Sequence, residues 1–368
     1  MSEHKCIPNL ERTSNRIRNY RRIENWENFF LDSAIYSVAV ALGVEYDNGF
    51  TPIAGITGDL FTYLYSDTAP CDSGVTNYVV MPEVVPAAFA SFGYDCEVLS
   101  PEQIQADLPA ALAGIHASVD RGIPVLAWGI GGVPGQNGSG YDILDEGALI
   151  GGYEEDCLLA QLYPGAERLA PVSFGGRPGV DEDGYTALPP ENALAGTHGI
   201  FIAGTKNTAK TPEDAYRKAV LSIPRWLTLP PTDEWIFGET AFARWAEVLL
   251  DDTLWQTPDE ELIWNKHCSP YCALCTSTGS FGGDSRAVDY LNRAAAACPD
   301  LTVISALLPQ YRKLSELSQQ IWDTHGGFMP SPENMQDHEY RARLADILLG
   351  MGKCCSNILQ IFRNENLI

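Results

Sequence analysis

The sequence predicts an α+β protein with two domains, a mixed N-terminal domain over residues 1–205 and a helical domain over residues 206–368. Two apolar runs predict the sheet, 123–129 and 147–153, because both are short and bounded by Gly, Pro and acidic residues. Runs of this kind fit strands of a covered sheet better than helices. The helical half is predicted by a helix start at Thr211 and Pro212, followed by two acids and by helical spacing to the C-terminus.

The composition is that of an ordinary globular chain, with 368 residues, 45% hydrophobic residues and a net charge of −24. This acidity argues against nucleic acid and against anionic membrane surfaces as partners, because both would be repelled. No apolar run reaches the roughly eighteen residues of a membrane span, and the N-terminus lacks the apolar core of a signal peptide. We therefore expect a cytoplasmic protein whose ten cysteines are reduced. A homodimer is compatible with the sequence.

A buried helix is predicted early in the chain. Asp32 and Ser33 supply cap chemistry, residues 34–42 are nearly all apolar or small, and Gly43 ends the run. A helix that is apolar on most faces lies inside its domain. The start of such a helix is a favourable place for a nucleophile, because the helix dipole stabilises a thiolate or an oxyanion.

The rest of the first domain alternates between helices and strands. A turn entering a strand or short helix is expected at 55–65, helices at 84–92, 102–107 and 112–120, and strands at 94–99, 157–163 and 199–203. Residues 131–143 form a Gly-rich loop, interpreted either as a lid beside a site or as a plain surface insertion. In the second domain, helices are expected at 212–228, 238–250, 258–277, 284–297, 302–324 and 335–364.

The order of these motifs resembles a known family. The residues that carry the resemblance are Gly55, Thr57, Gly58, Phe61, Gly122, Pro124, Trp128, Glu146, Ile150, Gly152 and Tyr153. Together they resemble the papain-like family typified by the N-terminal domain of butirosin biosynthesis protein H, which is distantly related to bacteriocin-processing cysteine peptidases. Segments 241–245 and 285–291 resemble the helical region of bacterial proteins that carry this domain. The resemblance implies a central helix packed on an antiparallel sheet, followed by an all-helical C-terminal domain.

The family's catalytic residues are substituted in this sequence. The resemblance implies a cysteine at the start of the central helix, where Asp32 and Ser33 stand, and a histidine at the position of Glu146. The orienting acid is expected before a proline, and here Tyr163 precedes Pro164. Without a Cys–His pair, no thiolate is available for cysteine-peptidase chemistry.

Three functions are compatible with the remaining groups. The first is binding of a small-molecule or peptide-like ligand, for example one bearing an amine, in a cleft between Asp32 and Glu146. The second is an amide-bond hydrolase or acyltransferase that uses Ser33 or Asp32 with Glu146. The third is a structural or interaction module, in which Asp32 is a helix cap and Glu146 a strand-end acid. Further residues expected to contact a ligand are Trp26, Asp59, Trp128, Tyr153 and Tyr163.

A second group of residues lies in the helical half. Cys268, Cys272 and Cys275 have the spacing of a cluster-binding motif, and with His267 they match a Cys3His zinc set. On a helix the three cysteines also fall on one face, at i, i+4 and i+7, and such a stripe is typical of packing. We expect buried thiols here, with no metal and no cofactor.

Overall fold

The computed structural model describes residues 4–8, 10, 30–44, 49–68, 76–131, 133–134, 141–142, 147–161, 185–207, 212–280 and 285–368. It confirms a mixed α+β protein with an antiparallel sheet and a helical C-terminal region. The chain divides into two compact units, and both are discontinuous in sequence. Unit 1 comprises residues 1–20, 30–53 and 80–211, and unit 2 comprises residues 21–29, 54–79 and 212–368. The division into domains over residues 1–205 and 206–368 stays a prediction.

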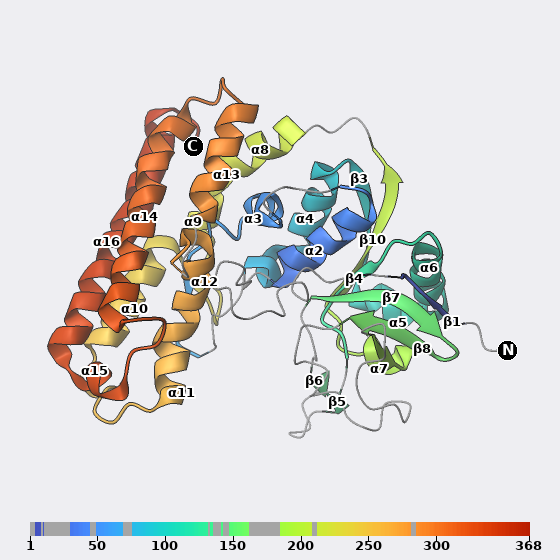
Figure 1. The fold of residues 1–368 in the computed structure, drawn as a ribbon, viewed down its shortest axis with the longest axis horizontal. Helices are drawn as coiled ribbons and strands as arrows, with labels where there is room; N and C mark the ends of the chain where they lie inside the picture. Colours follow the sequence, from blue (N-terminus) through green and yellow to red (C-terminus); the bar gives the residue numbers. More distant parts are fainter. Residues whose placement is uncertain are drawn as a thin grey trace. The chain divides into compact units, whose positions relative to one another are not determined.

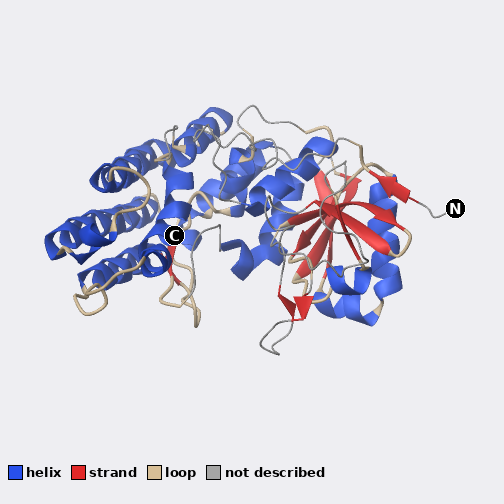
Figure 2. Ribbon diagram, turned by 60° about the horizontal axis from the view of Figure 1, so that its bottom comes forward, coloured by secondary structure: helices blue, strands red, loops and turns tan. Residues whose placement is uncertain are grey.

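Unit 1 is built on a seven-stranded antiparallel sheet, whose strands Figure 2 shows as one twisted group. Its central strands are β4 (Val125–Trp128) and β7 (Ala148–Glu154), as the two apolar runs predict. The strand order is β3 (Tyr94–Leu99), β10 (Gly199–Lys206), β4, β7, β8 (Cys157–Gln161) and β9 (Thr186–Leu188), while β1 (His4–Cys6) also pairs with β7. A separate short hairpin joins β5 (Val133–Pro134) to β6 (Tyr141–Asp142).

Strand β7 has three partners because its two halves pair differently. Its first half pairs with β4 through Val125 and Ile150, and its second half pairs with β1 from Gly152 to Glu154. The register against β8 shifts between Ile150 and Gly152. At the shift, a Cβ on Gly151 would lie 2.5 Å from Leu10 Cδ2, so only glycine fits there.

Helices cover both faces of the sheet (Figures 1 and 2). Helix α2 (Phe30–Ala41) contacts β4 on one face, beside α4 (Thr76–Ser91). Helix α6 (Leu108–Asp120) covers the other face and contacts β4, β7 and β10. A capping box at Ser100 starts α5 (Pro101–Ala106), and the Asp107 side chain caps α6, so local sequence signals fix both helix starts. Helix α7 (Pro190–Ala193) precedes β10.

Unit 2 is a helical assembly with one small β-ladder. Its longest helices, α14 (Val303–His325) and α16 (His338–Asn364), pack on each other, and α16 also packs on α10 (Gly238–Leu250). The other helices are α8 (Pro212–Leu221), α9 (Ile223–Leu227), α11 (Glu260–Ile263), α12 (Ser269–Thr278), α13 (Arg286–Ala297) and α15 (Pro332–Gln336). Strands β2 (Leu64–Tyr65) and β11 (Ile236–Phe237) pair within this unit, so the expectation of a purely helical region was wrong.

The single helix expected at 258–277 is three consecutive segments. A π-helix, η3 (Trp264–Cys268), lies between α11 and α12. A π-helical turn holds one more residue than an α-turn, which rotates the following side chains, and such turns are frequent at functional sites. His267 lies on this turn and is fully buried.

The sequence motif at 55–61 lies in unit 2, in the last residues of α3 (Thr51–Thr57) and the turn after it. The Phe61 ring packs edge-on against Tyr290 and Tyr311, and Gly55 lies against the Tyr290 ring. The motif therefore packs into the core of the helical unit.

Among the described helices, none combines the length and the apolar composition that crossing a membrane requires.

Candidate functional site

The first candidate site is the start of α2. The helix begins at Phe30, so Asp32 and Ser33 lie inside its first turn, and the expectation that they cap the helix was wrong. Both side chains are fully buried. One turn later, the Ser37 hydroxyl donates a hydrogen bond to the Ser33 carbonyl at 3.1 Å. The first turn carries the positive end of the helix dipole, which stabilises a negative charge on Asp32.

Trp128 ends β4, the strand that α2 contacts, and its side chain is buried. Its backbone carbonyl accepts hydrogen bonds from the Thr197 hydroxyl at 3.0 Å and from the His198 amide at 2.7 Å. The Trp128 and His198 rings lie 4.9 Å apart, and partial burial lowers the pKa of His198. Sequence reasoning missed His198, because the pairing of β4 with β10 brings it beside Trp128, which lies 70 residues earlier in the sequence.

Tyr153 lies on the face of the sheet that α6 covers. Its ring stacks on His116 with centroids 4.0 Å apart, and its hydroxyl donates to Asp120 Oδ1 at 3.0 Å. Lys5 of β1 forms an ion pair with the same carboxylate, and these bonds lower the pKa of Asp120. Tyr153 therefore fastens β7 to α6 and Lys5 fastens β1 to it, and the structure does not bring Tyr153 together with Asp32.

The remaining predicted site residues lie in unit 2 or outside the described residues. Asp59 is buried, but it belongs to unit 2. Trp26, Glu146 and Tyr163 lie outside the described residues. The pairing of Asp32 with Glu146 across a cleft stays a prediction.

The cysteine motif is buried inside unit 2. Cys268, Cys272 and Cys275 are free cysteines. Burial raises the pKa of Cys268 to about 12, and burial also raises the pKa of Cys275 well above its ordinary value. Within the described part of the chain, no three His, Cys, Asp or Glu side chains are grouped so that they could hold a metal ion. His267 points instead to Trp245 and His325.

These three side chains form a continuous hydrogen-bonded chain in unit 2. Trp245 Nε1 lies 3.2 Å from His267 Nδ1, and His267 Nε2 lies 2.9 Å from His325 Nε2. His325 Nδ1 lies 3.0 Å from the Phe328 carbonyl oxygen. Only one tautomer of each ring satisfies these contacts, because an indole nitrogen only donates and a carbonyl only accepts. His267 therefore carries its proton on Nε2, and His325 carries its proton on Nδ1.

Burial keeps both imidazoles neutral. Desolvation lowers the pKa of His267 well below its ordinary value of 6.5, and the neighbouring His325 lowers it further. Desolvation also lowers the pKa of His325, to about 4, although its bond to the Phe328 carbonyl acts in the opposite direction. The rings of Tyr271 and Tyr340 pack beside the pair. Sequence reasoning treated His267 only as a possible zinc ligand and missed His325, which lies 58 residues away.

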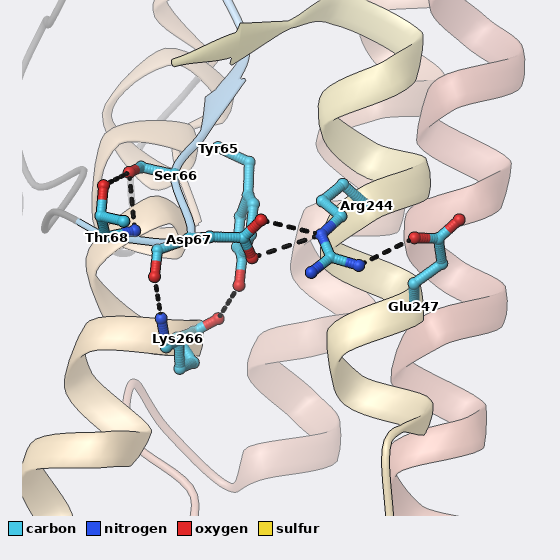
Figure 3. A network of polar contacts seen from close by, with 7 residues as sticks. All are labelled: Tyr65, Ser66, Asp67, Thr68, Arg244, Glu247 and Lys266. Atoms are coloured by element: carbon cyan, nitrogen blue, oxygen red, sulfur yellow. Dashed lines mark hydrogen bonds and ion pairs between the residues drawn. The ribbon is translucent and has the colours of Figure 1, made fainter. Parts of the chain in front are cut away.

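Tyr65, which packs on Trp245, belongs to the polar network drawn in Figure 3. The Tyr65 ring stacks on Trp245 with centroids 6.1 Å apart, and the Tyr65 hydroxyl donates to the Lys266 carbonyl at 3.4 Å. Lys266 Nζ donates to the Asp67 carbonyl, while Arg244 Nε donates to the Asp67 carboxylate at 3.0 Å. Both Arg244 and Asp67 are partly exposed, and such pairs contribute at most about 1 kcal/mol. Through Asp67, the network connects Lys266 of η3 to Arg244 of α10, the neighbour of Trp245.

No family model matches the chain, and no curated protein matches it.

Proposed function

We propose that unit 1 is a papain-like domain without cysteine-peptidase chemistry, which binds a small peptide-like or amine-bearing ligand at the start of α2. The observation that carries the proposal is the complete burial of a carboxylate and a hydroxyl, Asp32 and Ser33, side by side in the first turn of a largely apolar helix. Burying a carboxylate costs several kcal/mol, as an order of magnitude, unless charge or hydrogen bonds compensate it. A cationic amine is a natural partner for such a group.

The architecture of unit 1 supports this proposal. A buried helix packs on an antiparallel sheet, which is the arrangement that the papain-like resemblance implies. The same resemblance implies that Asp32 and Ser33 occupy the position of that family's nucleophile. Because both side chains are fully buried, a ligand can reach them only when this end of the helix becomes uncovered.

Thermal-shift and calorimetric titrations with putrescine and with glycylglycine test the binding function. We expect one of these probes to raise the melting temperature of the native chain. The shift should be lost in Asp32→Asn, which removes the charge, and kept in Ser37→Ala, which alters a buried hydroxyl one turn further along the same helix. An equal shift in Asp32→Asn, or no shift with either probe, would contradict the proposal.

An amide-bond hydrolase or acyltransferase is the second candidate function, and the Ser33 hydroxyl at the positive end of α2 favours it. Labelling with a fluorophosphonate probe distinguishes it from binding. Covalent labelling that disappears in Ser33→Ala and in Glu146→Gln would show a serine nucleophile with a carboxylate base. If neither labelling nor ligand binding occurs, unit 1 is a structural or interaction module.

A further inference from the structure

The His267–His325 pair has a property that an isolated buried histidine lacks. Each ring nitrogen of the two imidazoles has a partner, and the partners at the two ends of the chain fix the direction of every hydrogen bond. Trp245 can only donate at one end, and the Phe328 carbonyl can only accept at the other. The tautomer of each imidazole between these two ends is therefore fixed.

The hydrogen bonds of Trp245, His267, His325 and Phe328 cannot accommodate an additional proton on either imidazole. A proton on His267 Nδ1 would face the Trp245 N–H group, and a proton on His325 Nε2 would face the proton on His267 Nε2. In both cases two donors meet at about 3 Å, and a buried donor without an acceptor costs roughly 1–3 kcal/mol. Protonation of either ring must therefore break a link.

The groups packed around the pair do not compensate a positive charge. Trp245 faces it from α10, Tyr271 from α12 and Tyr340 from α16, and none of these side chains carries a negative charge. Arg343 lies over the Tyr340 ring at 5.7 Å, Cys268 follows His267 on η3, and the Asp323 carboxylate on α14 accepts from Gln319. Among the described residues, no carboxylate forms an ion pair with either imidazole.

The pair is asymmetric in its access to water. His267 is fully buried, whereas His325 is only partly buried, at the C-terminal end of α14. The helix ends at His325, and the next residue, Gly326, caps it in the left-handed conformation with φ of 70°. The turn that follows carries Met329 with 41% of its surface exposed. His325 is therefore the ring that a local opening of this turn would release.

The geometry points to a proton-responsive latch. At neutral pH the His267–His325 bond holds the end of α14 and the turn at 326–330 against η3, and uptake of one proton by His325 releases them. The π-helical turn is part of the device, because it carries His267 between Trp245 and His325. This latch lies in unit 2 and does not depend on the function proposed for unit 1.

Two measurements on the full chain test the latch. Nitrogen–proton correlation NMR of the imidazoles at pH 7 should show the Nε2–H tautomer for His267 and the Nδ1–H tautomer for His325. Hydrogen exchange over residues 324–329, corrected for intrinsic rates, should report the opening. With a pKa of 6.5 for the released ring and about 4 for the closed one, the opening constant should rise roughly 20-fold between pH 7 and pH 5.

Two variants separate the latch from general acid sensitivity. In His325→Gln, the amide oxygen can accept from His267 Nε2 but does not titrate, so the acid-induced rise in exchange should disappear. His338→Gln is the matched control, because it removes an exposed histidine of the same unit that pairs with Asp252 and takes no part in the Trp245–His267–His325 hydrogen bonds. This variant should keep the acid-induced rise in exchange. The opposite tautomers, or an equal rise in His325→Gln and native protein, would overturn the proposal.

Discussion

Replacing Gly58 by alanine tests whether the motif at residues 55–61 is a packing element of unit 2. Gly58 has φ of +96°, and a Cβ built on it would lie 2.7 Å from Trp226 Cδ2. Real Cβ atoms essentially never approach a neighbour so closely. Trp226 is buried, so its indole cannot turn aside into solvent.

Two costs add in this variant. A non-glycine residue in the left-handed region costs about 1–2 kcal/mol, and forcing extra volume into a packed core costs about 1–3 kcal/mol. We therefore expect Gly58→Ala to lower the free energy of unfolding by about 2–5 kcal/mol. Gly326→Ala supplies the matched control, because Gly326 has φ of +70° in the same unit but no atom within 4 Å of its Cβ position. Only the conformational cost of about 1–2 kcal/mol applies there.

Urea unfolding followed by tryptophan fluorescence is the assay, because the buried indoles of Trp226, Trp245 and Trp255 all lie in unit 2. The difference between the two alanine variants isolates the clash with Trp226. Adding Trp226→Leu to Gly58→Ala should recover part of the clash energy, since the smaller side chain leaves room for the methyl group. If Gly58→Ala is no more destabilising than Gly326→Ala, the close packing of Gly58 on Trp226 is refuted.

Three further predictions follow from unit 2. Arg341→Met keeps the packing of the side-chain stem but removes the bonds to the Leu249 carbonyl and to Asp252, so urea unfolding should show a loss of about 1–3 kcal/mol; an unchanged midpoint would contradict it. Folding lowers the pKa of His325, so its contribution to the free energy of unfolding is complete above pH 6.5 and is lost as the pH falls toward 4. Between pH 7 and pH 5 the free energy of unfolding should fall by about 2 kcal/mol in the native protein and by less in His325→Gln. Parallel pH profiles of the two proteins would contradict this prediction. The Cys268 thiol should stay unreactive toward Ellman's reagent until the chain unfolds, because burial raises its pKa to about 12; rapid reaction in the folded protein would show that the thiol is accessible.

Local sequence signals predicted much of the secondary structure. The apolar runs at 123–129 and 147–153 became the central strands β4 and β7, and the alternating segment at 94–99 became β3. Gly93 and Gly122 follow helices in the left-handed conformation, as glycine after a helix predicts. These features depend on short-range chemistry, which a single sequence contains.

Features that depend on distant contacts could not be predicted in this way. Gly55 and Phe61 belong to the helical unit because Tyr290, more than 200 residues later in the chain, packs against both. The π-helical turn needs one extra residue in a helix whose composition is ordinary, and the partner of His267 comes from the end of another helix. At the candidate site in unit 1, the sequence indicated Asp32 and Ser33, but their complete burial follows from packing around α2.

The pairing of β1 with the second half of β7 has a consequence for biosynthesis. Residues 4–6 leave the ribosome about 150 residues before their partners at 152–154. Until then strand β1 has no ladder to join. The sheet therefore closes through a long-range step, which is slow in folding because the intervening chain must be ordered first. An affinity tag fused directly before His4 would act on this late step, whereas a tag after the C-terminal helix α16 would leave it untouched.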